Sequence, residues 1–558
     1  MNLVDDVTLR SLIIKAGLTD KGGMEQIDDY IKNTGSTLYE ALIEKNIAND
    51  EKLGILIADH LKLPFVVLAK ISIPEDVYKI VPERMARKQR VVCFALDDSG
   101  AKLAMANPGN KAVIESISKK INKKVIPYFA TERDIVGTFH IYQKDLQATF
   151  NRLIEESTLQ PLKDVPVIKI VDLIIAYANQ DRSSDIHIEP QEKDTIVRFR
   201  IDGMLHDIFR LPIRLHDRII TRIKVLSRLR TDEHLAAQDG KMRFDTEEET
   251  IDIRVSILPI VDGEKAVLRL LSTHARQFSL SDLGMSEEDL KKLTKAMKKS
   301  YGMILSTGPT GSGKSTSIYS ILKIINRRER NITTIEDPVE YRIKGVNQIN
   351  VNPKSGLTFA NGLRSILRQD PNVIFVGEIR DVETAGIAVN AALTGHLVVS
   401  TLHTNDAATA LPRLIDMKVE PFLVASTINI IVAQRLVRKI CEMCKTSIDI
   451  TQEELQKNFA QMTIDRHFGK GDKFQIYYGQ GCKICHQTGF SGRIGVFEML
   501  EVSKEIKKMI IEKLDADDIV KQAVKEGMTT MLDDGIEKVK IGLTTIEEVL
   551  RVTKVELT

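Results

Sequence analysis

The segment GPTGSGKST, residues 308–316, constrains the fold most, because it fits the pattern G-x-x-x-x-G-K-[ST]. The apolar run MILSTG precedes it, and the helical pattern KSTSIYSILKII follows. A strand, a glycine-rich turn and a helix in this order surround phosphate groups with backbone N–H groups. We therefore predict a nucleotide site with Lys314 on the phosphates and the Ser315 hydroxyl on Mg²⁺. Its residues are Gly308, Pro309, Thr310, Gly311, Ser312, Gly313, Lys314, Ser315 and Thr316.

The rest of the chain predicts a multidomain α/β protein, since 558 residues are too many for one core. From about residue 286, helices alternate with short apolar runs, which indicates a parallel sheet. Before it, residues 166–272 read as a second α/β unit with paired strands and D-G turns. Residues 1–145 mix short helices with a hairpin, and 146–165 read as a helical linker.

Two acidic groups follow predicted strands of the parallel sheet. NVIFV ends in Gly377-Glu378, where a P-loop strand ordinarily ends in the aspartate that helps to hold Mg²⁺. Glu378 is therefore the expected metal-side carboxylate. Glu336 opens the cluster EDPVE after another strand. Acids at a strand end are also common in solvated loops, but beside a P-loop they favour Mg²⁺ binding and water activation.

Two histidines, His396 and His403, lie at the two ends of a third strand in TGHLVVSTLHTND. A role in sensing the γ-phosphate and a role in packing are both open at this stage.

Four of the five cysteines form two C-x-x-C pairs, Cys441/Cys444 and Cys482/Cys485, separated by 37 residues (445–481). Four thiolates in two tight turns are typical of a tetrahedral Zn²⁺ site. Cys482 to His486 also fits C-x-x-C-H, the pattern for c-type haem attachment, and free thiols are a third reading. Haem attachment would leave the first pair unexplained.

The composition limits the partners. The 79 basic and 77 acidic residues give a net charge of +2, which does not support a protein that coats nucleic acid. No secretory signal opens the sequence, and no apolar stretch is long enough for a membrane span. These features predict a cytoplasmic protein with at most peripheral membrane contact.

Arginines on predicted strands of residues 166–272 are candidates to meet the charge that develops during ATP hydrolysis. We expect Arg254 and Arg269 to take this role, with Arg198 and Arg200 as second choices. Each could equally be a paired surface arginine.

A long ordered series of segments runs through SSDIHIEP, FRIDG, AAQDGKMRF, GEKAVLRLL, GPTGSGKSTS, TIEDPVEY, GLTFANGLRSILRQDPNVIFVGEIRD, TGHLVVSTLHTND and QTGFSGRIGVFEML. The series resembles the secretion superfamily of hexameric ATPases, in the assembly branch that includes type IV pilus and type II secretion motors. The resemblance covers roughly residues 55 to 558 and is highly specific.

This resemblance implies a RecA-like P-loop core (286–558) with a zinc insert (441–486), preceded by a PAS-like domain and a mixed α/β N-terminal domain. It implies Glu336 as the catalytic glutamate, Glu378 as the atypical Walker B acid, and His396 and His403 as the His box. It also implies zinc on the four cysteines. The expected protein is a homo-hexameric ATPase using ATP and Mg²⁺, coupled to pilin polymerisation through an inner-membrane platform protein and membrane-associated docking proteins.

The sequence departs from the family pattern in two places. Many relatives begin with a cyclic-di-GMP motif built on R-L-G-x-x-L, whereas this chain reads LRSLIIKAGLT, so we expect weak or no binding of that dinucleotide. Many relatives are also richer in arginine where this chain reads RTDEHLAAQDGK.

Three rival functions stay open. A type II secretion motor would use the same chemistry for a pseudopilus, and the long region ahead of residue 166 slightly favours the pilus branch. A DNA translocase on a RecA-like core lacks support from net charge. A nucleotide-gated scaffold would require missing catalytic groups, and none is missing.

Overall fold

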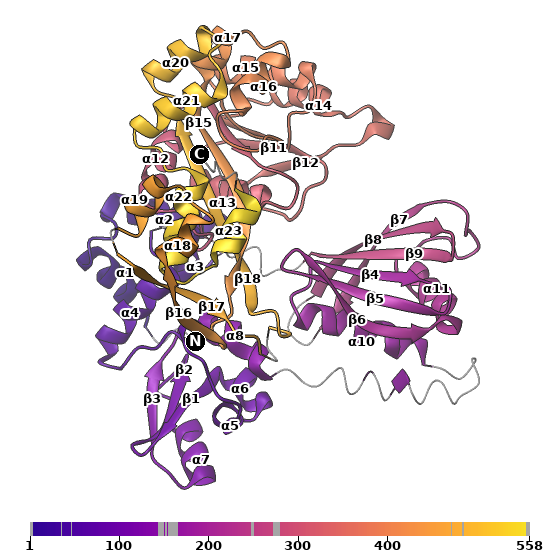
Figure 1. Ribbon diagram of the computed structural model, residues 1–558, viewed down its shortest axis with the longest axis vertical. Coiled ribbons are helices and arrows are strands. Elements are labelled where there is room, and N and C mark those ends of the chain that lie inside the picture. Colours follow the sequence, from indigo (N-terminus) through magenta and orange to yellow (C-terminus); the bar gives the residue numbers. More distant parts are fainter. Residues whose placement is uncertain are drawn as a thin grey trace. The chain divides into compact units, whose positions relative to one another are not determined.

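A computed structural model describes residues 4–34, 36–45, 47–142, 150, 153–154, 166–246, 250–271, 279–469, 471–482 and 485–553 (Figure 1). The predicted linker 146–165 lies almost wholly outside these residues. The predicted α/β character holds throughout, with separate sheets in the N-terminal, middle and C-terminal parts of the chain.

The P-loop lies in a seven-stranded sheet of order β12-β11-β13-β14-β10-β15-β18. Six strands are parallel, and β18 pairs antiparallel with β15. The strands are β10 (Gly302–Thr307), β11 (Ile332–Glu336), β12 (Asn347–Asn350), β13 (Val373–Val376), β14 (Leu397–Leu402), β15 (Ile428–Ile440) and β18 (Phe490–Glu501). This is the parallel sheet that the alternating pattern predicted.

Helices cover both faces of this sheet. Side chains alternate between the two faces along each strand, so the strands supply apolar residues to two cores. Met303 and Leu305 of β10 join one core, whereas Ile304 joins the other. The first core contains residues of α14 (Phe359–Ile366), α15 (Val382–Leu393), α16 (Ala410–Asp416), α17 (Pro421–Thr427), α20 (Lys504–Ile511) and α21 (Ala516–Lys525). The second contains residues of α12 (Glu287–Met297) and α13 (Lys314–Ile325).

The cysteine-containing insert interrupts the sheet between β15 and β18. It is a hairpin of β16 (Lys445–Thr451) and β17 (Lys473–Gly479), with α18 (Gln452–Gln456) and α19 (Gln461–His467) between the strands. Its helices share a small apolar core with α22 (Met531–Lys540) and α23 (Ile546–Val552). The insert is therefore packed on the C-terminal helices.

The middle part of the chain contains a six-stranded antiparallel sheet of order β6-β5-β4-β9-β8-β7. Helices α10 (Val167–Gln180) and α11 (His216–Leu226) supply residues to the apolar core on one face. One predicted D-G turn is Asp202-Gly203, where both residues have positive φ, as a type I′ turn requires. At the other predicted pair, Asp262-Gly263, the turn lies at residues 261 and 262, and Gly263 already pairs with Ile260 as the first residue of β9. The strands are β4 (Asp185–Pro190), β5 (Asp194–Ile201), β6 (Met204–Pro212), β7 (Gln238–Asp245), β8 (Thr250–Ile260) and β9 (Gly263–Leu271).

The N-terminal part begins with four helices that share one core: α1 (Asp6–Lys15), α2 (Lys21–Thr34), α3 (Leu38–Glu44) and α4 (Asp50–Leu61). The predicted hairpin follows as β1 (Val91–Asp97) and β2 (Gly100–Met105), in a sheet completed by β3 (Val125–Phe129). Four helices precede, separate or follow these strands along the chain: α5 (Glu75–Tyr78), α6 (Glu83–Gln89), α7 (Lys111–Ile121) and α8 (Glu132–Thr138).

Candidate nucleotide and metal sites

The P-loop requires glycine at two positions because β15 passes close to it. Gly308 (φ +141°) and Gly313 (φ +89°) adopt backbone conformations that other residues rarely take. A β-carbon at Gly308 would lie 2.5 Å from the backbone oxygen of Gln434, and one at Gly313 would lie 2.6 Å from its Nε2. The Gln434 amide oxygen also accepts a hydrogen bond from Ser317 Oγ of α13 at 2.7 Å. Gln434 thus sets the shape of both ends of the loop.

Lys314 begins α13 and is buried. Its ammonium donates hydrogen bonds to the carbonyl oxygens of Gly308 at 2.7 Å and Pro309 at 2.9 Å. Burial lowers the pKa of Lys314 to about 8, and the nearby Glu378 carboxylate opposes that shift. The hydroxyl of Ser312 is buried and makes no hydrogen bond within the described part of the chain. A cation, an uncommitted buried hydroxyl and a glycine-shaped loop fit a phosphate group.

Glu378 follows β13 and lies at the same end of the sheet as the P-loop, because β10, β13 and β14 run parallel and both segments follow the carboxyl ends of their strands. One of its carboxylate oxygens accepts from Arg380 Nε at 2.7 Å and from His403 Nε2 at 3.2 Å. Its charge also acts on Lys314. The structure therefore brings together three residues that the sequence proposed separately: Lys314, Glu378 and His403.

Glu336, at the end of β11, is held by three hydrogen bonds. Thr334 Oγ1 donates at 2.6 Å, Gln348 Nε2 donates at 3.2 Å, and the Tyr319 hydroxyl donates to the other oxygen. Burial is the main cause that raises the pKa of this carboxyl group above its usual range. A carboxylate with an elevated pKa and a fixed orientation is suited to accept a proton.

His396 lies apart from this group. It precedes β14, and its Nδ1 is 2.9 Å from the carbonyl oxygen of Ala391. His403 follows the same strand seven residues later, so a rise of about 3.3 Å per residue places the two histidines at opposite ends of β14, about 23 Å apart. The sequence left γ-phosphate sensing and packing open for both histidines. The structure brings His403 to Glu378 and leaves His396 at the other end of β14.

Sequence reasoning missed three side chains near the P-loop. Tyr319 is the sixth residue of α13 and reaches Glu336. Arg380 pairs with Glu378, and Arg435 of β15 donates from Nη2 to Asn405 Oδ1 at 3.0 Å. Arg380 could have been suspected from its place two residues after Glu378. The place of Arg435 near the P-loop could not be predicted from the sequence, because it depends on the pairing of β15 with β10.

The four arginines singled out by the sequence lie on strands of the middle sheet. Directly opposed residues of an antiparallel pair share a face, so register places Arg200, Asp185, Arg269, Arg254 and Lys241 in one row across five strands. Asp185 accepts from Arg269 Nε at 2.9 Å and is 3.5 Å from Arg200 Nε. The row combines four cations with one carboxylate, opposite the face that packs on the helices.

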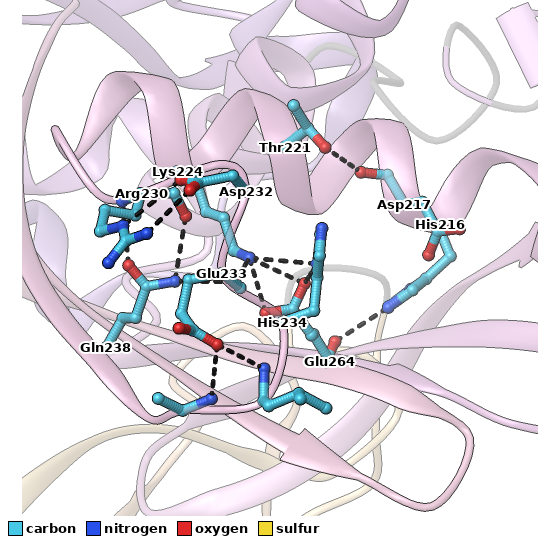
Figure 2. A network of polar contacts seen from close by, with 12 residues as sticks. His216, Asp217, Thr221, Lys224, Arg230, Asp232, Glu233, His234, Gln238 and Glu264 are labelled. Atoms are coloured by element: carbon cyan, nitrogen blue, oxygen red, sulfur yellow. Dashed lines mark hydrogen bonds and ion pairs between the residues drawn. The ribbon is translucent and has the colours of Figure 1, made fainter.

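A polar network, buried at Lys224 and Glu264 and exposed at Arg230 and His234, links α11 to the segment that leads into β7 (Figure 2). Lys224 of α11, which is completely buried, donates to Glu264 Oε2 at 2.8 Å and to the Glu233 carbonyl oxygen at 2.6 Å. His234 Nδ1 is also 2.8 Å from Glu264 Oε2. Gln238 accepts from the Arg230 amide at 2.9 Å and donates to its carbonyl oxygen at 3.0 Å. The segment RTDEHLAAQDGK, which departs from the family pattern, is therefore cross-linked by hydrogen bonds and leads into β7, the strand that carries Lys241.

The four insert cysteines converge at the base of the β16–β17 hairpin, with all four sulfurs within 4.8 Å of one another. Individual Sγ–Sγ separations are 3.9 Å for Cys441 and Cys482, 3.8 Å for Cys444 and Cys485, and 3.6 Å for Cys482 and Cys485. Tetrahedral zinc with bonds of about 2.3 Å keeps its sulfurs about 3.8 Å apart. Cys93 is buried elsewhere, in β1. The set fits one tetrahedral metal ion.

These features define the class of protein: a P-loop ATPase with a tetracysteine cluster. The family model described as Type II/IV secretion system protein matches residues 160–551, and a MshEN domain model matches residues 61–149. The chain belongs to the type II/IV secretion ATPase family, as the resemblance of its motifs predicted.

Among its relatives, the type IV pilus assembly ATPase PilB of Myxococcus xanthus is 35% identical over 97% of this chain and 98% of its own length. The type II secretion system protein E of Pseudomonas aeruginosa is 43% identical over 74% of this chain and 80% of its own length. The ATPase DotB of Yersinia pseudotuberculosis shares the fold, with a TM-score of 0.52 and 20% identity over 69% of this chain and 93% of its own. No helix among the described residues is long and apolar enough to cross a membrane.

Proposed function

We propose that this ATPase drives type IV pilus assembly. The observation that carries the proposal is the extent of similarity: pilus assembly ATPases of Myxococcus xanthus and Pseudomonas aeruginosa align with 97% and 99% of the chain. Type II secretion relatives align with 70% to 74% of it. The N-terminal part is thus shared with the pilus branch, and that part would dock the motor on its membrane assembly.

In the proposed chemistry, Lys314 binds the ATP phosphates, and the exposed Ser315 side chain and Glu378 hold Mg²⁺. The bound metal would supply charge neutralisation on the phosphates. Glu336 accepts a proton from the attacking water, and its elevated pKa supports this role. His403 contacts the γ-phosphate side of the site, supported by its hydrogen bond to Glu378.

The cationic row of the middle sheet would complete this site. We propose that Arg254 and Arg269 meet the phosphate charge when the domains close around ATP, with Arg198 and Arg200 as second choices. Support comes from the surplus of positive charge in the row and from the exposed fraction of Arg269, 62% of its side chain. Closure on ATP and opening after hydrolysis would be the power stroke, passed around a ring of six subunits.

The wider assembly follows from the same proposal. Zn²⁺ on the four cysteines would stabilise the insert. The division into residues 1–145, 146–165, 166–272 and 286–558 remains our proposed domain organisation. The hexamer would work in the cytoplasm at the inner face of the membrane, on a platform protein and docking proteins, and without nucleic acid.

Deletion of the gene in its host tests this function. We expect surface pili, counted by electron microscopy, to disappear and to return with the wild-type chain but not with Lys314→Ala. Exported enzymes, measured in the same cultures, should stay at the parental level. Normal piliation together with a loss of exported enzymes would contradict the pilus assignment.

A type II secretion motor is the second candidate. Its specific support is the higher identity of type II secretion relatives within the aligned region, 42% to 45%. The two assays above separate the candidates. ATPase activity that rises on addition of DNA would instead favour a translocase.

A further inference from the structure

The loop that follows His403 is tied to three strands of the ATPase sheet. Thr307 Oγ1 of β10 donates to the Asp406 carbonyl oxygen at 3.3 Å, and Arg435 of β15 donates to Asn405. The Ala407 amide donates to Glu498 Oε1 of β18 at 3.0 Å. Residues 403–409, here called the His403 loop, therefore run from the nucleotide site to the antiparallel edge strand.

Glu498 contacts a second element through its other oxygen. Glu498 Oε2 accepts from the Met531 amide, the first residue of α22, at 3.4 Å. The residue is 6% exposed, and no cation pairs with it within the described ranges. Burying a carboxylate without a cation costs free energy, so its two backbone N–H partners are what hold it in place.

Helix α22 leads from Glu498 to the insert. Asp533 in its first turn is 2.7 Å from His467 Nε2 of α19, and Glu537 is 2.9 Å from Nδ1 of the same ring. Ile536 and Val539 pack with apolar residues of the insert helices. A displacement at the start of α22 would therefore shift the contacts that α22 makes with the insert that carries the four cysteines.

We infer that Glu498 is a positioning residue that couples the His403 loop to α22, so that the nucleotide state reaches the C-terminal helices and the tetracysteine insert. The inference rests on the proposed place of His403 at the nucleotide. Interfaces and packed cores transmit such shifts as discrete rearrangements, and a single carboxylate bonded to both elements supplies the contact.

Hydrogen exchange on the full-length protein, with and without Mg²⁺ and a non-hydrolysable ATP analogue, tests this coupling. In the wild type we expect nucleotide to slow exchange in peptides covering 403–411 and 529–536. Glu498→Gln removes one acceptor oxygen. It should keep the nucleotide-dependent protection at 403–411 and reduce the protection at 529–536 at least twofold. Its kcat should fall about tenfold while KM and nucleotide Kd change less than twofold. Glu501→Gln is the control, because Glu501 lies on the same strand and pairs with Lys295 instead of the loop or α22.

A second pair of variants acts from the other side of the contact. Met531→Pro removes the amide donor at a helix position that tolerates proline, whereas Met531→Ala shortens the side chain and keeps the donor. Only the proline variant should lose nucleotide-dependent protection at 529–536. The inference is overturned if the wild type shows no such protection or if Glu498→Gln and Met531→Pro both retain it. His403→Ala tests the proposed role of that histidine separately, through kcat.

Discussion

The hydroxyl of Tyr319 donates a hydrogen bond to the carboxylate of Glu336 and accepts one from the Glu340 amide at 3.1 Å. Tyr319 belongs to the helix that begins with Lys314, so one helix supplies the lysine that we propose binds phosphate and a donor to the proposed general base. The orientation of that base is thereby linked to the P-loop.

Tyr319→Phe should lower kcat roughly tenfold and move the acid limb of the pH–rate profile upward. Burial already raises the pKa of Glu336, and the tyrosine hydrogen bond opposes that shift. Without the bond the pKa rises further, so the carboxylate is lost at a higher pH and activity falls earlier as pH decreases. Tyr341→Phe is the control, since its ring packs 4.5 Å from that of Tyr319. Superimposable profiles for Tyr319→Phe and wild type would contradict this account.

Lys314→Ala should abolish nucleotide binding, because the phosphates lose their main cation, whereas Glu336→Gln should bind ATP and stop turnover. Fluorescent-nucleotide titration and phosphate release measure the two effects. Because the pKa of Lys314 is about 8, wild-type affinity should weaken as pH rises through that value. Near-normal hydrolysis by Glu336→Gln would transfer the role of base to Glu378.

Arg254→Ala should retain ATP binding and lose most turnover, up to about 10³-fold. Mixed with wild type before assembly, it should also inhibit the wild-type subunits, because sites in a ring act in succession. Arg243→Ala, an exposed arginine paired with Asp252, is the control. Wild-type rates for both Arg254→Ala and Arg269→Ala, or full activity in a monomer, would exclude the proposed arginine role.

Purified protein should contain about one Zn²⁺ per chain. Elemental analysis measures it, with Cys93→Ser as the variant that keeps the metal and Cys482→Ser as the one that loses it. Absence of zinc together with rapid alkylation of all four insert thiols under native conditions would remove the site.

Cyclic-di-GMP should bind weakly or not at all, because the N-terminal sequence lacks R-L-G where many relatives have it. Isothermal titration calorimetry on the full chain measures this directly. Heats that fit a micromolar or tighter site would show that other residues of the N-terminal part replace the motif.

The local pattern of the sequence determined much of this protein. Strand, glycine turn and helix around residues 302–325 are specified by neighbouring residues, since backbone geometry and hydrophobic periodicity act over short distances. The same holds for the Asp202-Gly203 turn and for the two C-x-x-C pairs. These motifs predicted the family, the α/β class and the cysteine cluster.

Tertiary structure alone decided which distant side chains meet. The order and parallel direction of the strands bring Glu378 and His403 to Lys314. They leave His396 at the other end of β14, although both histidines border that strand. Strand register puts Arg200, Arg269 and Arg254 on one face. Tyr319 with Glu336, and Glu498 with Ala407 and Met531, are likewise products of packing. A linear sequence fixes periodicity, but the pairing of strands and the packing of helices on them determine contacts between remote residues.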